Sequence, residues 1–452
     1  MTLTKTRSTL TSALLLTLCS PPAWAAPQQK TEAPDGFTVA ISGDMLGPYT
    51  ESFPEASTDF TAVKALIGSA DVAFANQEGT TLDPATFPGW LSADNGGGYP
   101  RHSLAVTRAF KSIGIDLVSR ANNHAMDYGT EGLLTSDRAF DAIGLAHAGT
   151  GRSLSDARAP AYYNSGETTV ALIATASTFP ASFAAGDAAR GVNARPGLNP
   201  LHVKPTIMVS EREAKILRGM AVRQGWQGYD LPTAKSLAFN VGETSYRVSK
   251  TPGIAYDVNA GDRAALLASV AAAREKSQLV LFSIHAHETR SGGYEDPVPA
   301  DFLPPLFHSV IDAGADMVVR HGPHAVQGIE IYRGKPIFYG VGHLFTDLPK
   351  TLKIASADPE PTVITLPDTW FESVIAINEY RGGRVARIVL HPMMMDGRDG
   401  PDRGMPRPAK GGDAARILSR VAANSRLFGT NVDIRGEQGV IDVAAHAGGK
   451  SQ

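Results

Sequence analysis

Five stretches of this chain share one pattern: a short apolar run, rich in β-branched residues, that ends abruptly in side chains able to bind a metal. They read FTVAISGD, DVAFANQE, DLVSRANNHAMD, LVLFSIHAHE and DMVVRHGPH. Short apolar runs with turn residues at their ends are typical of buried strands. In open α/β sheets, ligands bind beyond the carboxyl ends of the strands. The pattern therefore predicts one site to which five strands contribute.

The side chains at these strand ends are carboxylates, amides and imidazoles. The candidates are Asp44, Asn76, Glu78, Asn123, His124, His285, His287, His321 and His324. A single Asp or Asn at a strand end is more often a turn residue, so the hypothesis depends on the agreement of five ends. Oxygen and imidazole ligands without thiolate suit Mn, Fe, Zn or Mg. We therefore expect a divalent metal centre of one or two ions that supports hydrolysis.

The same residues lie within longer motifs that carry a family resemblance. These motifs are GDMLG at 43–47, FANQE at 74–78, ANNHAMDYG at 121–129 and DAGADMVVRHGPHAVQGIEIYRGKPIFYGVGHLF at 312–345. With them the chain resembles the CapA family of poly-γ-glutamate capsule synthesis, a branch of the calcineurin-like metallophosphoesterase superfamily. The resemblance implies an α/β fold with two sheets in a four-layer α/β/β/α sandwich.

The resemblance also implies roles for individual residues. The implied metal ligands are Asp44, Glu78, Asn123, His285, His321 and His324. His124 is implied as the general acid, because an imidazole can protonate a leaving group near neutral pH. Asp127 is expected to orient His124, with a helix N-cap as the alternative role. Arg320 is expected to contact an anionic substrate, with a surface salt bridge as the alternative.

The chain departs from the family pattern at several positions. Metallophosphoesterases begin the first motif with Asp-x-His, whereas Met and Leu follow Asp44 here, so one imidazole is missing. The family commonly has Gly at the position of Arg320, Trp-Gly at Ala286 and His287, and Asn at His343. The missing imidazole predicts a mononuclear centre or a weaker second metal site.

One main functional hypothesis and two alternatives remain open. The main hypothesis is an exported, metal-dependent hydrolase of capsule or exopolymer biosynthesis. Its partners would be an anionic polymer, or a phosphorylated or glutamyl substrate, and the capsule synthesis machinery. The first alternative is a non-catalytic factor that binds the polymer, and the second is a metal-independent acid–base enzyme such as an epimerase. The 42 basic and 45 acidic residues are nearly balanced, which gives no support for a nucleic-acid partner.

The N-terminus predicts export. Lys5 and Arg7 precede an apolar stretch, and a small-residue cleavage site follows at 23–25. We expect residues 1–25 to be a signal peptide and the mature protein to be periplasmic or secreted. Cys19 is the single cysteine, so the mature chain would contain no disulfide. No later stretch approaches the roughly 18 apolar residues of a membrane helix, so we expect no stable span after cleavage.

The rest of the chain alternates between predicted strands and helices. Helical periodicity is expected over 53–67, 102–113, 129–143 and 263–276. Residues 180–260 interrupt this alternation and contain several prolines, so we expect a lid-like insertion within a single domain of residues 36–442, with a plain surface excursion as the alternative. Residues 443–452 are expected to form a flexible tail.

Overall fold

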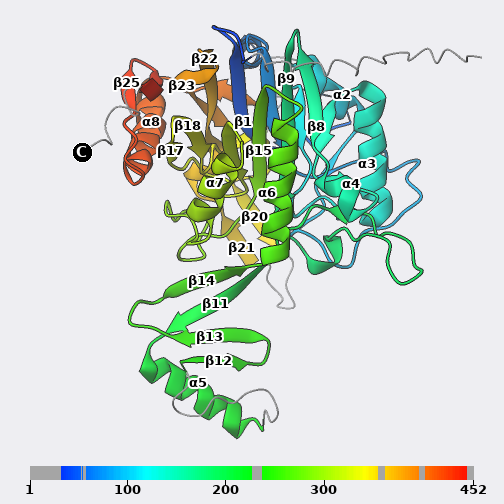
Figure 1. Ribbon diagram of the computed structural model, residues 1–452, viewed down its shortest axis with the longest axis vertical. Coiled ribbons are helices and arrows are strands. Elements are labelled where there is room, and N and C mark those ends of the chain that lie inside the picture. Colours follow the sequence, from blue (N-terminus) through cyan, green and yellow to red (C-terminus); the bar gives the residue numbers. More distant parts are fainter. Residues whose placement is uncertain are drawn as a thin grey trace, which may run out of the picture. The chain divides into compact units, whose positions relative to one another are not determined.

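The computed structural model describes residues 32–51, 53, 58–225, 237–354, 362–395 and 403–444. The predicted signal peptide lies outside the described residues, as do most of the predicted tail and the part of the insertion at 226–236. Two large sheets form the centre of the described chain (Figure 1). None of the described helices combines the length and the apolar character that a membrane span requires.

The larger sheet has ten strands, and β1 lies inside it. The strand order is β25-β26-β23-β22-β1-β2-β5-β6, with β19 beside β1 and β24 beside β23. The bounds are Thr38–Leu46 for β1, Val72–Gln77 for β2, Leu117–Ser119 for β5, Ala146–Ala148 for β6, His343–Thr346 for β19, Glu372–Arg381 for β22, Arg384–Met395 for β23, Pro406–Pro408 for β24, Asp433–Arg435 for β25 and Gln438–Asp442 for β26. Because β1, β2 and β5 are parallel, their carboxyl ends meet at one edge of the sheet.

The smaller sheet has six strands in the order β17-β18-β16-β15-β9-β8. The bounds are Ala161–Ser165 for β8, Thr168–Ala176 for β9, Leu279–His285 for β15, Met317–His321 for β16, Ile329–Tyr332 for β17 and Lys335–Phe338 for β18. Strands β9, β15, β16 and β18 are parallel. Strand β16 contacts β1 of the larger sheet, so the carboxyl ends of both sheets lie together.

Alternating apolar residues pack the two sheets against each other and against the outer helices. On β1, Val39 and Ile41 join the core between the sheets, whereas Ala40 faces α1 and α2. Helices α1, α2 and α3 cover the larger sheet. Helices α6 and α7 cover the smaller one (Figure 1). Their bounds are Thr58–Ile67 for α1, Leu104–Ser112 for α2, Gly129–Ile143 for α3, Ala260–Arg274 for α6 and Leu303–Asp312 for α7. The predicted α/β fold with a four-layer α/β/β/α sandwich is confirmed.

Residues 203–258 contain a separate four-stranded sheet in the order β12-β13-β11-β14. Its strands span Val203–Val209 for β11, Ala238–Val241 for β12, Thr244–Val248 for β13 and Gly253–Val258 for β14. Helix α5 (Glu211–Arg223) packs against β12 and β13 (Figure 1). Val209, Ala214 and Phe239 form a small core of their own, so this insertion has its own packing.

The remaining elements are short, apart from one C-terminal helix. They are β3 (Thr80–Thr81), β4 (Arg101–His102), β7 (Thr150–Gly151), α4 (Leu154–Arg158), η1 (Ala181–Phe183), β10 (Gly197–Leu198), β20 (Thr351–Ile354), β21 (Thr362–Thr365), η2 (Asp368–Phe371) and α8 (Gly411–Arg426). Helix α8 packs Ile417 and Val421 into the central core. The buried carboxylate of Glu372 also accepts hydrogen bonds from Arg416 and Arg420, which ties α8 to β22.

A close approach of two glycines brings β19 beside the end of β1. A Cβ added at Gly43 would lie 1.7 Å from the carbonyl oxygen of Gly342. The amide of Asp44 donates a hydrogen bond to that same oxygen at 3.2 Å. The parallel pairing that follows places Asp44 opposite His343. Only glycine at position 43 leaves room for this contact.

We expect Gly43→Ala to lower the free energy of unfolding by roughly 1–3 kcal/mol, because the added methyl group overpacks this junction. Gly412 in α8 is the matched control, since a Cβ there meets no atom within 4 Å. Gly412→Ala should leave stability unchanged, or raise it by up to about 1 kcal/mol through helix propensity. Urea denaturation measures both variants, and equal stability of Gly43→Ala and the wild type would contradict the prediction.

Candidate functional site

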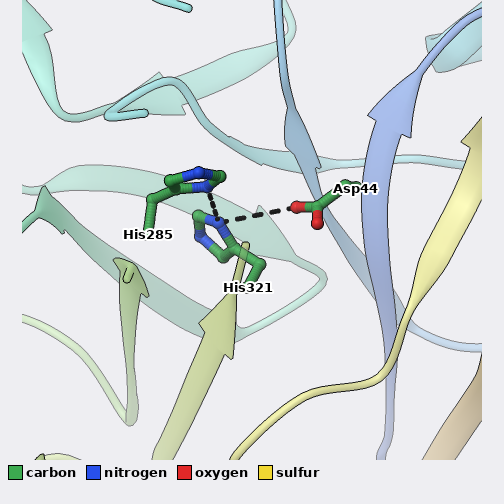
Figure 2. A group of neighbouring side chains, drawn as sticks. All are labelled: Asp44, His285 and His321. Atoms are coloured by element: carbon green, nitrogen blue, oxygen red, sulfur yellow. Dashed lines mark hydrogen bonds and ion pairs between the residues drawn. The ribbon is translucent and has the colours of Figure 1, made fainter. Parts of the chain in front are cut away.

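The strand ends that carry the predicted ligands converge between the two sheets. Asp44 lies near the end of β1, and Glu78 directly follows β2. His285 and His321 are the last residues of β15 and β16, and they lie side by side in register. Figure 2 shows Asp44, His285 and His321 pointing toward one another. The Nδ1 atoms of the two histidines are 2.9 Å apart, and His321 Nδ1 is 3.6 Å from Asp44 Oδ1.

Three sets of side chains in this site could each hold a cation. They are Asp44 with His285 and His321, Asp44 with His324 and His343, and Glu78 with His285 and His287. Within each set the possible ligand atoms lie within 4.8 Å of one another. Ligand atoms that each lie about 2.1 Å from the same cation have a similar spacing. The donors are carboxylate oxygens and imidazole nitrogens, which suit divalent transition metals.

Glu78 is a buried carboxylate without a hydrogen-bond partner on either oxygen. Its Oε1 faces three imidazoles, at 3.7 Å from His285 Nε2, 3.9 Å from His324 Nε2 and 4.0 Å from His124 Nε2. A buried charge that is neither paired nor hydrogen-bonded is costly. A cation between Glu78 and the imidazole of His285 would remove that cost, so the residues present fit a metal.

The side-chain amide of Asn123, like the carboxylate of Glu78, has a buried oxygen without a hydrogen-bond partner. Its Nδ2 donates a hydrogen bond to the carbonyl oxygen of Gly96 at 2.8 Å, which fixes the orientation of the amide. The Oδ1 atom is buried and has no hydrogen-bond partner, so it is available as an oxygen ligand. Asn76, by contrast, donates to Asp44 Oδ1 at 2.8 Å and holds that carboxylate in place. The two candidate amides therefore differ: Asn123 can ligate and Asn76 positions a ligand.

Burial and neighbouring charges act in opposite directions on the two carboxyl groups. Burial, together with the charges of Asp44 and Asp127, raises the pKa of Glu78 well above its ordinary value. Burial would also raise the pKa of Asp44, but the imidazoles of His324 and His321 lower it below its ordinary value. An added cation would favour the ionised form of both groups, because a bound ion is the largest local charge in such a site.

Four imidazoles of the site are neutral at neutral pH. Burial and the neighbouring histidines lower the pKa of His285 and His287 well below their ordinary value. Burial also lowers the pKa of His321 and His343 to about 4. Neutral imidazole is the form that binds metal, so these rings offer lone pairs without first losing a proton.

His124 and Asp127 form a hydrogen-bonded pair beside the ligands. His124 Nδ1 lies 2.6 Å from Asp127 Oδ2, and the amide of Gly96 donates to Asp127 Oδ1 at 2.9 Å. Both carboxylate oxygens of Asp127 are thus engaged. The N-cap residue of α3 is Tyr128, which makes no side-chain cap hydrogen bond. The geometry therefore agrees with an orienting role for Asp127 rather than a capping role.

Arg320 does not lie where the sequence predicted it. Its fully buried guanidinium donates to the carbonyl oxygens of Ala286 at 2.9 Å and Glu288 at 2.8 Å, and to Gln327 Oε1 at 3.1 Å. These acceptors direct it into the protein rather than toward a substrate. Burial also excludes the alternative of a surface salt bridge, so Arg320 instead supports the segment between β15 and α7.

Two histidines of the site were not among the ligands implied by the resemblance. His287 follows β15 and was only one of the candidates at the strand ends. His343 begins β19, and its position was noted only as a departure from the family pattern. At both positions a histidine replaces another residue type, at the end of one strand and at the start of another. This signal could have identified His287 and His343 as candidate ligands.

A cavity of about 520 Å³ opens beside the ligands. Glu78, Asn123, His124, His287 and His324 lie in its wall. Its aromatic lining residues are Tyr49, Tyr99, Tyr128, Tyr294 and Trp370. The described part of the insertion at 180–260 contributes no residue to the wall of this cavity.

Comparison with known proteins agrees with the motifs. Residues 38–348 match the family model described as bacterial capsule synthesis protein PGA_cap. The chain belongs to this family. The uncharacterized protein y4sH of Sinorhizobium fredii (strain NBRC 101917 / NGR234) is 31% identical, covering 91% of this chain and 94% of the relative.

More distant family members carry descriptive names. The PGA biosynthesis protein CapA of Bacillus subtilis (strain 168) is 25% identical, covering 71% of this chain and 66% of that protein. Among solved structures, a hypothetical protein from Thermus thermophilus matches with a TM-score of 0.38 and 13% identity, covering 79% of this chain and 98% of that chain.

Buried neutral histidines make the stability of this family member depend on pH. His102 is buried, its Nδ1 lies 3.0 Å from Gln77 Nε2, and burial lowers its pKa to about 4. The unfolded chain, with histidine pKa values near 6.5, binds more protons between about pH 6.5 and pH 4 than the folded one. The stabilisation is therefore complete above about pH 6.5 and is lost as the pH falls toward 4.

We expect the free energy of unfolding of the chelator-treated protein to fall by up to about 1.4 kcal/mol per pH unit for each such histidine. Urea denaturation between pH 7 and pH 4.5 measures this slope. His102→Gln should reduce the slope by up to that amount, since glutamine does not titrate. An unchanged slope in the variant would show that His102 is not held neutral by burial.

Proposed function

We propose that this protein is a metal-dependent hydrolase of capsule or exopolymer biosynthesis. The observation that carries the proposal is Glu78, whose two buried oxygens lack partners while three imidazoles face one of them. Membership of the capsule synthesis family supports the process. The wall of the cavity, where His124 lies beside Glu78, supports catalysis.

Some residues of the site would hold a cation, and others move a proton. When bound, a divalent cation supplies Lewis-acid polarisation of a substrate oxygen and makes water acidic enough to attack near neutral pH. Asp44, Glu78, Asn123 and the histidines of the three sets would hold it. His124 donates a proton from Nε2 to the leaving group, while Asp127 holds the ring through Nδ1.

The cavity favours a substrate with both a flat or apolar part and a group that reaches the ligands. Tyr99, Tyr128, Tyr294 and Trp370 offer aromatic surface in its wall. A phosphorylated or glutamyl substrate would place its scissile bond between His124 and Glu78. We further propose that the protein acts after export, in the periplasm or outside the cell, because of the predicted signal peptide.

The first test is metal content and turnover of the mature protein purified without chelator. Mass spectrometry of bound metals gives the content, and an aryl phosphodiester and a γ-glutamyl anilide serve as substrates. We expect bound metal and hydrolysis of one of the two substrates, and we expect chelator to abolish this hydrolysis. Bound metal without turnover of either substrate would favour the polymer-binding factor. Turnover that survives chelation would favour metal-independent acid–base chemistry.

His124→Ala should lower kcat by roughly 10²–10⁴-fold, the usual contribution of a general acid, while the metal content stays at the wild-type level. His391 on β23 lies in none of the three ligand sets and not in the cavity wall, so His391→Ala is the matched control with unchanged turnover. Turnover of His124→Ala within a few-fold of the wild type would remove the general-acid role.

Glu78→Gln should have opposite effects on the metal-free and metal-loaded protein. Without metal, the variant removes a buried unpaired carboxylate and should be more stable by about 1–3 kcal/mol. With metal, wild type gains about 2.7 kcal/mol at a free concentration of about 100 times Kd, and the variant should gain far less. Thermal denaturation with and without Mn²⁺ measures both effects. An equal metal-induced shift in the two proteins would contradict a ligand role for Glu78.

A further inference from the structure

Two of the three ligand sets can be occupied at the same time without sharing a residue. Asp44 belongs to the set with His285 and His321 and also to the set with His324 and His343. His285 belongs to the first of these sets and also to the set with Glu78 and His287. The pair without a common member is therefore Asp44, His324 and His343 together with Glu78, His285 and His287. Each set of this pair contains one histidine that the family resemblance did not imply as a ligand.

The orientation of His343 exposes a ligating nitrogen to the site. Its Nδ1 lies 2.9 Å from the carbonyl oxygen of Trp370. A carbonyl oxygen only accepts, so Nδ1 carries the proton and Nε2 carries the lone pair. Such a hydrogen bond from the other ring nitrogen to a backbone carbonyl is typical of histidines that bind metals. The Nε2 atom lies 2.8 Å from His324 Nδ1, on the side of Asp44.

The position of His343 is fixed by backbone pairing rather than by a flexible loop. It is the first residue of β19 and the register partner of Asp44 on β1. His324, in turn, is held at a positive φ of 54°, a conformation that costs energy in a residue other than glycine. This strained turn directs His324 Nδ1 to 3.6 Å from Asp44 Oδ2. The strand register and the strained turn thus bring the possible ligand atoms of Asp44, His324 and His343 close together.

His287 supplies the third possible ligand of the set with Glu78 and His285. Its Nε2 lies 2.9 Å from His285 Nε2, which is itself 3.7 Å from Glu78 Oε1. The ring occupies the space above Gly322, where an added Cβ would lie 2.7 Å from His287 Cδ2. His321 Nδ1 contacts the other ring nitrogen of His285, so it positions that ring with Nε2 toward Glu78.

We infer that the site binds two cations, one held by Asp44, His324 and His343 and the other by Glu78, His285 and His287. The inference rests on the metal centre of the proposed function, and it adds His343 and His287 as ligands of two separate ions. His343, from the strand beside β1, then supplies an imidazole next to Asp44.

The test is the metal stoichiometry of the full mature chain after loading with Mn²⁺ and dialysis. Wild type should retain two equivalents, His343→Ala one, His287→Ala one, and the double variant none. His102→Ala is the matched control, because His102 is a buried histidine outside the three sets, and it should retain two. Where His343→Ala does not fold, His343→Gln replaces it, since a glutamine amide can still donate to the Trp370 carbonyl.

The outcomes separate this inference from the proposed function. Two equivalents in both His343→Ala and His287→Ala would overturn the inference, and chelator-sensitive hydrolysis in the wild type would leave the proposed function intact. Stepwise loss of one equivalent in each variant, without turnover of any substrate, would support the inference and count against the hydrolase. A wild-type protein that binds no Mn²⁺ would overturn both.

Discussion

A buried carboxylate without a hydrogen-bond partner is the constraint on which this site depends. Glu78 sits at the junction of two sheets, with imidazoles on several sides and Asp44 close enough to raise its pKa. Such a group is unfavourable in a protein interior, and the neutral histidines around it cannot neutralise its charge. The arrangement becomes favourable when a cation is shared between the carboxylate and the lone pairs.

The sequence predicted the fold well because the relevant signals are local. Helix α3 runs over Gly129–Ile143, the predicted span, and α6 begins three residues before the predicted range. Apolar runs ending in polar residues marked β1, β2, β5, β15 and β16. The parallel pairing of these strands then brings their ends together, so the convergence of Asp44, Glu78, His285 and His321 followed from pattern and topology.

The sequence could not predict the direction in which a side chain points at the end of its strand. Arg320 precedes the candidate ligand His321 by one residue, yet alternation along β16 directs it away from His321 and toward the carbonyl oxygens of a neighbouring segment. His343 shows the reverse case, since its role depends on pairing between β1 and β19, which no local pattern reveals. The insertion likewise packs around its own core, because its apolar residues are satisfied within it.

The pairing of Asp44 with His343 spans most of the chain, from the first strand to the nineteenth. A growing or partly translocated polypeptide therefore contains Asp44 and Glu78 long before it contains β19. Until that strand docks, the ligand set built on Asp44 and His343 does not exist, and the glycine contact that sets their register has not formed. Metal binding at this point of the molecule would thus report that the chain has folded at least as far as β19.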